Sequence, residues 1–405
     1  MNASENHSPG ASRRPGAGFV LFSFGFRPFF LGAAVWAAVA VPAWLLMYRG
    51  AIDIPSRLVF STWHSHEMVF GFAGAAMAGF LLTAVPNWTG RLPVRGGPLI
   101  ALFFLWLTAR VANLVSDVWG AGLAGVLDVS LFAALFIYVL REVRAGKNYR
   151  NLPVAVAVAV FAIANGMAHL EASDVIPGTG AGLRLGISVV LMMIGLIGGR
   201  IVPSFTLNWM MRHGKDARPT PFSRYDAVTL TVTLMALLTW TVASGSPVAG
   251  GLFALAAVLH LVRLVRWAGH RTGAEPLLLI LHVGYAWLPV GYGLLAVSML
   301  ANLLPETVAL HALTAGAIGT MIAAVSSRAI LGHTGRPLHA GPGTVALYAL
   351  IVIGATLRIL ASFFPDQYGA WVLVAGILWA SGYALFALIY GPMLLRPAVS
   401  ASPPA

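Results

Sequence analysis

Two stretches of this chain decide how it folds: HEMVFGFAGAAMAGFLLTAVPNWTGR at residues 66–91 and HALTAGAIGTMIAAVSSRAILGHTGR at residues 311–336. Each is an apolar run long enough to cross a bilayer core, opened by a histidine and closed by Thr-Gly-Arg. Aligned without gaps, they are identical at 8 of 26 positions. A histidine at the mouth of a membrane helix is costly to place in lipid and usually serves a site. The echo therefore predicts two related helices that carry His66 and His311 at one membrane depth.

The composition extends this prediction to the whole chain of 405 residues, of which 59% are hydrophobic and only 9% charged. Such a chain is typical of a polytopic membrane protein and not of a soluble globule. We predict an all-α integral membrane protein with twelve transmembrane helices, at residues 29–47, 66–86, 97–116, 121–141, 152–171, 183–200, 226–243, 248–267, 277–299, 306–331, 343–362 and 369–393.

The basic residues orient these helices. With the N-terminus inside, 20 of the 25 Lys and Arg residues fall on the cytoplasmic face, as the positive-inside rule requires. We expect a disordered cytoplasmic tail at 1–18, a twelve-span domain at 19–396 and a C-terminal tail at 397–405, in a bacterial inner membrane with both termini cytoplasmic. The net charge of +12 then reflects topology and anionic membrane lipids, so no nucleic-acid partner is expected.

The chain has no cysteine. Disulfides, iron–sulfur clusters, thiolate-ligated haem and blue-copper centres are therefore excluded. Any metal must be held by histidine, methionine or carboxylate side chains.

Four histidines gather near the outer side, namely His64, His66, His169 and His311. We predict that His66 and His311 are the axial ligands of one haem b, because neutral imidazole is a good ligand for iron. If span 2 begins at His66, His64 lies in the preceding loop and can replace His66 or serve a second centre. His169 is either a further metal ligand or an interfacial residue wetted by headgroups.

Several other embedded residues are candidates for a role at the site or in helix packing. Arg57, Arg110 and Arg184 are rare outer-face cations that could pair with haem propionates. Asp128 is the most embedded carboxylate and a candidate for proton conduction. The glycines that follow His66 and His311 give smooth helix faces, which suit either close helix packing or a porphyrin lying flat on the backbone.

Five motifs follow one another along the chain, namely FRPFF at 26–30, WHSHEMVFG at 63–71, GGRIVPSFT at 198–206, HALT at 311–314 and GHTGRP at 332–337. In this order they resemble the NnrS family of bacterial inner-membrane proteins, and the resemblance runs from about residue 20 to 395. The resemblance implies haem, copper and a role in tolerance of nitric oxide and nitrosative stress. It does not supply a reaction.

The architecture is also similar to that of the haem–copper oxidase and nitric oxide reductase catalytic subunit, which has twelve spans and ligates its low-spin haem from spans 2 and 10. Here His66 and His311 lie on those two spans. Spans 2, 6 and 10 are spaced four apart, which suggests a threefold arrangement of four-helix units. No pair of histidines on spans 6 and 7 supplies the copper site of that superfamily.

Two functions follow as hypotheses. The first is a haem-containing membrane protein that handles nitric oxide or nitrosylated small molecules, supplied by a quinol or another electron donor. The alternative is a secondary transporter whose membrane histidines and Asp128 relay protons, since twelve spans and glycine-interrupted helices suit that class too. The presence of a coloured cofactor distinguishes them.

The charge distribution makes the topology testable. A reporter fused after Lys147 should be read inside the cell, and one fused after Asp174 should be read outside, because a span separates the two positions. Paired alkaline phosphatase and green fluorescent protein fusions measure this. The opposite pattern at both sites would invert the predicted orientation.

Overall fold

A computed structural model describes residues 20–216 and 218–399, and over these residues the chain is helical with no β-strand. The predicted tail at 1–18 lies outside the described residues. Twelve helical stretches are long and apolar enough to cross a membrane. The prediction of an all-α polytopic membrane protein is therefore confirmed. In chain order the spans are α1 (Phe26–Tyr48), α2–η2–α3 (Phe60–Thr89), α4 (Gly97–Leu114), α6 (Ala121–Ala145), η3–α7 (Tyr149–Ala172), α8–η4–α9 (Ala181–Arg212), α10 (Arg224–Val242), α11–η5 (Pro247–Arg271), α12 (Pro276–Ala301), α13–η6–α14 (Glu306–His333), α15–η7 (Pro342–Phe363) and η8–α16 (Pro365–Leu395).

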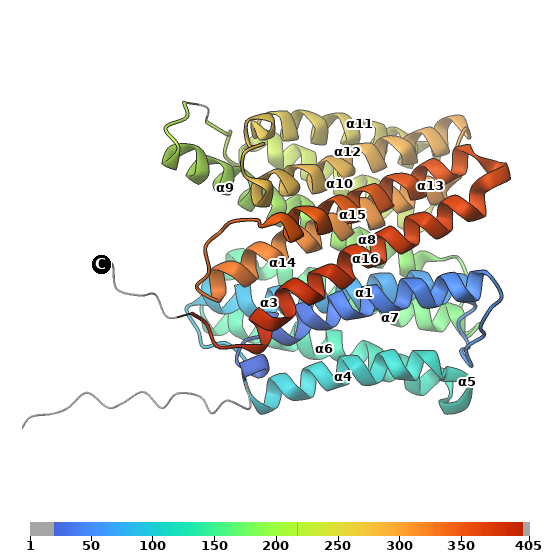
Figure 1. The fold of residues 1–405 in the computed structure, drawn as a ribbon. Coiled ribbons are helices and arrows are strands. Elements are labelled where there is room, and N and C mark those ends of the chain that lie inside the picture. The colour runs from blue at the N-terminus through green and yellow to red at the C-terminus, as the bar shows by residue number, and fades with distance from the viewer. Residues whose placement is uncertain (1–19, 217, 400–405) are drawn as a thin grey trace, which may run out of the picture.

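The spans form one bundle of roughly parallel and antiparallel helices (Figure 1). The start of α1 and the end of α16 lie at the same end of this bundle, as an even number of crossings requires. Two short elements of the described chain lie outside the spans: η1 (Val20–Phe22) precedes the first span, and α5 (Ser116–Trp119) lies between α4 and α6. The side chain of Arg27 joins the start of α1 to the end of α16, because it donates hydrogen bonds to the carbonyls of Leu394 (2.7 Å) and Arg396 (2.8 Å).

Spans 2, 6 and 10 differ from the others in the part of the chain that the structure describes. Each contains a π-helical segment, namely η2 (Glu67–Ala73), η4 (Ile194–Gly198) and η6 (Ala312–Gly319). π-helical turns are rare and occur mostly at functional sites. Their recurrence on every fourth span supports the threefold arrangement of four-helix units.

A π-helical turn frees backbone carbonyls from the regular ladder, and neighbouring spans supply the donors. The indole of Trp106 donates to the Gly71 carbonyl at 3.0 Å, and that of Trp379 donates to the Ala315 carbonyl at 3.2 Å. The Gly195 carbonyl of span 6 accepts a hydrogen bond from the guanidinium of Arg263, which lies on α11, at 2.7 Å. Because lipid offers no partner for a bare carbonyl, these bonds fix the neighbouring helices against the three central spans.

Arg263 of α11 also organises a buried polar cluster among spans 6 to 9. It donates to Asp226 Oδ1 and to the Tyr285 hydroxyl, both at 2.7 Å. The imidazole of His260 lies between that hydroxyl (2.8 Å) and the hydroxyl of Thr233 (2.9 Å). Every charge in this cluster has an opposite partner, so it serves to join spans 6 to 9.

The glycine faces of spans 2 and 10 pack against aromatic side chains. A Cβ atom added to Gly74 would lie 2.6 Å from Phe132 Cζ, and one added to Gly316 would lie 2.6 Å from Trp287 Cδ2. Protein rings therefore fill the space at these glycines. The porphyrin interpretation of the glycine faces is wrong, and the helix-packing interpretation is confirmed.

Substitution at one of these glycines should weaken the fold. Gly74→Ala should destabilise the protein by about 1–3 kcal/mol, since the Phe132 ring has to move within a packed core. Gly122→Ala in α6 is the matched control, because its added methyl meets nothing within 4 Å. Thermal unfolding in detergent measures both. Equal melting temperatures for the two variants would contradict the packing interpretation.

Candidate functional site

His64 and His66 stand in the same helical turn at the start of span 2, but their side chains point in different directions. The helix α2 runs from Phe60 to His66, so the expectation that His64 lies in a preceding loop is wrong. Both histidines are helical, and residues two apart on a helix point about 200° apart. The two imidazoles therefore face different surroundings, and one metal cannot bind both.

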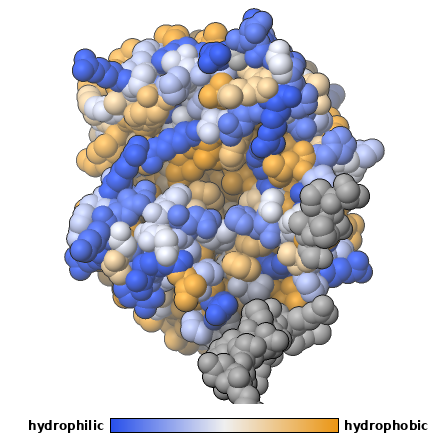
Figure 2. Space-filling view, turned by 90° about the vertical axis from the view of Figure 1, so that its left-hand side faces the viewer, coloured by the Kyte–Doolittle hydropathy of each residue, from blue (hydrophilic) through white to orange (hydrophobic). Residues whose placement is uncertain are grey.

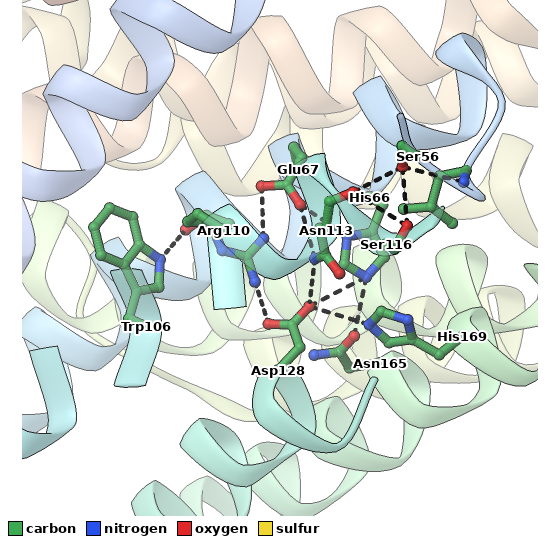
Figure 3. A network of polar contacts seen from close by, with 12 residues as sticks. Ser56, His66, Glu67, Trp106, Arg110, Asn113, Ser116, Asp128, Asn165 and His169 are labelled. Carbon is green, nitrogen blue, oxygen red and sulfur yellow. Dashed lines mark hydrogen bonds and ion pairs between the residues drawn. The ribbon is translucent and has the colours of Figure 1, made fainter. Parts of the chain in front are cut away.

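His66 faces a polar cluster buried between spans 2 to 5 (Figure 3). At its centre, Arg110 of α4 donates to Glu67 Oε2 at 2.6 Å and to a carboxylate oxygen of Asp128 on α6. The amide of Asn113 donates to the same two carboxylates, at 3.0 Å and 3.2 Å. Glu67, Arg110 and Asp128 are all fully buried. We call these four residues, with the two histidines described next, the acidic cluster.

Two histidines complete the acidic cluster. His66 Nε2 lies 3.3 Å from Asp128 Oδ2, and His169 Nε2 of α7 lies 3.2 Å from the same oxygen. One ligand atom from each of these three residues lies within 4.8 Å of the others, which is the spacing of a candidate metal site. His66 Nε2 also lies 3.1 Å from Asn165 Oδ1, so Asn165 helps to orient the His66 ring.

The charges of the acidic cluster favour a cation. Two carboxylates, Glu67 and Asp128, share one guanidinium, Arg110, so the sum is −1 when both are ionised and the imidazoles are neutral. An uncompensated charge is costly in a buried, low-dielectric position. A bound metal ion or a proton on one imidazole would compensate it. Imidazole nitrogen and carboxylate oxygen are ligands that first-row transition metals such as copper, zinc and iron accept.

His64 faces the other way, into a cavity of about 190 Å³ that we call the outer cavity. His311 lies on its wall, with the indoles of Trp44 and Trp379 and the guanidinium of Arg358. Spans 1, 2, 6, 10, 11 and 12 all contribute lining residues. The structure thus brings His311 together with His64, while His66 is not among the residues that line this cavity.

The two imidazoles of the outer cavity are held differently. His311 Nδ1 donates to the Thr307 carbonyl at 2.7 Å, which leaves Nε2 free as a ligand atom. This is the arrangement in which a backbone carbonyl fixes the tautomer of a metal-binding histidine. His64 is stacked on Trp44 with 4.4 Å between ring centroids. Its Nδ1 is buried without a hydrogen-bond partner among the described residues.

Further unpartnered polar atoms test whether this cavity fits a haem. Arg358 Nε and Nη1 and Trp44 Nε1 are buried without partners among the described residues. A haem held by two histidines would need two imidazole donors, apolar walls and a cation for its propionates. The outer cavity offers His64 and His311, a largely apolar wall and Arg358. The residues present therefore fit the group.

The three arginines predicted as propionate partners lie elsewhere. Arg57 is 64% exposed and pairs with Asp117 at 2.7 Å, and Arg110 belongs to the acidic cluster. Arg184 donates to the carbonyls of Thr179 (2.9 Å) and Thr241 (3.2 Å). None of them lines the outer cavity.

Sequence reasoning missed Arg358 as a site residue. Its signal was present, because an arginine inside an apolar run of membrane-spanning length usually faces a cavity or a partner. Asn113 was missed as well, and no pattern in the sequence links it to Asp128, which belongs to the next span.

Comparison with known proteins now adds to this geometry. Residues 20–398 match the family model described as NnrS protein. The chain belongs to the NnrS family. No curated protein matches it. Family membership supports, in general terms, a multi-pass membrane protein linked to nitric oxide and associated with metals.

Removal of the Arg110 guanidinium from the acidic cluster of this NnrS-family chain should destabilise the fold. Arg110→Met leaves two buried carboxylates without their partner, and we expect a loss of about 3–5 kcal/mol in the free energy of unfolding. Arg57→Met is the control, because its ion pair is exposed and should contribute at most about 1 kcal/mol. Denaturant or thermal unfolding in detergent measures the difference. Two variants of equal stability would show that Arg110 does not hold the acidic cluster together.

Proposed function

We propose that this chain is a haem-containing membrane protein that binds nitric oxide or nitrosylated small molecules and protects the cell from nitrosative stress. The observation that carries the proposal is the outer cavity, which two imidazoles from spans 2 and 10 face. Haem b would be held by His64 and His311, with Arg358 toward the propionates. This assignment keeps His311 from the sequence prediction and replaces His66 by His64.

A metal ion, copper by family resemblance, would be held in the acidic cluster. The donors are His66, His169 and Asp128, and Asn165 and Glu67 would orient His66 from either side of its ring. The net charge of the cluster supports a cation there. Because His64 and His66 belong to one helical turn, the two centres would be neighbours.

The setting suits nitric oxide. This molecule is small and apolar and therefore concentrates in the bilayer, and ferrous haem, when bound, supplies an iron that nitric oxide ligates. Of the two imidazoles that would hold the iron, His64 is the one that we expect to give way to nitric oxide, because its Nδ1 has no hydrogen bond among the described residues while His311 is held by Thr307.

The proposal includes a location and partners. The protein would reside in the bacterial inner membrane with both termini cytoplasmic, where the basic loops meet anionic lipid headgroups. Reduction of the iron requires an electron donor, and a quinol dissolved in the same bilayer is suited to this role. The electron donor and nitric oxide are the partners to be tested.

Histidine variants test the two centres separately. His64→Ala and His311→Ala should each lose most of the haem, measured as the pyridine haemochrome of the purified protein. His66→Ala and His169→Ala should keep the haem and lose the metal of the acidic cluster, measured as copper per chain by mass spectrometry. His213→Ala is the control, because this exposed residue belongs to neither centre and should change neither value. Full haem with an unchanged Soret band in both His64→Ala and His311→Ala would refute the assignment.

The nitric-oxide role has its own test. Addition of nitric oxide to the dithionite-reduced protein should shift the Soret band, and deletion of the gene should slow growth under nitrosative stress. Complementation with His311→Ala should fail to restore growth, whereas His213→Ala should restore it. A colourless protein without iron, together with unaffected growth, would favour the proton-coupled transporter.

A further inference from the structure

A second cavity, which we call the inner cavity, lies further along the central spans and has a volume of about 100 Å³. The π-bearing spans 2, 6 and 10 supply all but one of its lining residues, and Phe30 of α1 supplies the other. The lining residues from these spans include Ala76 of span 2, Val190 of span 6 and Ile322 of span 10.

The inner cavity continues the outer one along the same three helices. On span 2 the lining passes from Phe72 in the outer cavity to Ala76 in the inner cavity, and on span 6 from Ile187 to Val190. These steps are one helical turn each. On span 10 the step is likewise one turn, from Ile318 to Ile322. The two cavities are therefore stacked along the central spans, one turn apart.

The chemistry of the inner cavity selects its occupant. Among its lining side chains only Ser326 carries a hydroxyl, and the rest are aliphatic, thioether or aromatic groups and glycine. Water needs two to four polar partners to reside in a cavity, whereas an apolar cavity of about 150 Å³ stays dry and binds benzene or xenon. A quinone head group would find almost no hydrogen-bond partner here. The space suits a small uncharged molecule.

The position of the inner cavity suggests where such a molecule enters. Phe80, Ile201 and Val325 lie on α3, α9 and α14, and these helices run toward the end of the bundle where α16 ends (Figure 1). Figure 2 faces that end and shows a hollow with hydrophobic walls inside a hydrophilic rim. The inner cavity lies between this end of the bundle and the outer cavity along the three central spans.

We propose that the inner cavity is a binding and transit site for small uncharged apolar molecules of diatomic size, on a route to His64 and His311. The identity of the physiological occupant, nitric oxide, rests on the proposed function. The existence of the site does not, because xenon can probe it in protein with or without haem.

Xenon binding tests the site directly. Crystals of the full chain pressurised with xenon, or xenon-129 spectra of the purified protein, should report a bound atom beside Val190. Val190→Phe should abolish this signal, because its ring fills the cavity. Val126→Phe is the matched control, since Val126 is 64% exposed on the outer surface of α6 and lines neither cavity. If Val190→Phe fails to fold, Ala76→Leu fills the same space from span 2.

Ligand kinetics test the route. After flash photolysis of the nitrosylated reduced protein, association of nitric oxide should be several-fold slower in Val190→Phe than in Val126→Phe, with unchanged haem content. Xenon at a different place, or no xenon at all, would overturn the site. Xenon beside Val190 with equal association rates in both variants would overturn the route and indicate lateral entry from lipid. Loss of the proposed function alone, seen as absence of haem, would leave the xenon result unaffected.

Discussion

Backbone carbonyls in a bilayer core must find donors within the protein, and the three π-helical segments place this demand at the centre of the bundle. Indole and guanidinium groups of neighbouring spans meet it, at Gly71, Gly195 and Ala315. Two of the segments begin directly after a histidine, His66 or His311. The hydrogen bonds that satisfy the freed carbonyls thus also fix the helices on which the histidines stand.

The acidic cluster and the outer cavity use the same turn of span 2 in different ways. On one side, Glu67, Arg110 and Asp128 are buried together, and the two ionised carboxylates exceed the single guanidinium by one negative charge. On the other side, His64 and Arg358 retain nitrogen atoms without partners among the described residues. A bound cation would complete the first site, and a ligand with its own polar groups would complete the second.

The fold was predictable to a large extent because length and hydropathy alone locate the twelve spans. The division between His64 and His66 was not, since it depends on whether the helix begins at Phe60 or at His66 and helix ends are the least certain feature of a sequence. The π-helical segments could not be predicted either, because a run of five to eight mostly apolar residues fits a π-helix and an α-helix equally well. The choice of Arg358 over Arg57, Arg110 and Arg184 depends on which helices are neighbours. Sequence spacing does not contain that information.

The two candidate sites draw on very different lengths of the chain. Every residue of the acidic cluster lies between His66 and His169, within four consecutive spans. The outer cavity needs Trp44 from the first span and Trp379 from the last. Because a chain is synthesised and inserted from its N-terminus, the acidic cluster can close while most of the protein is still unmade, but the outer cavity is not enclosed until the final helix is in place. The acidic cluster is therefore able to bind its ligand earlier in synthesis than the outer cavity.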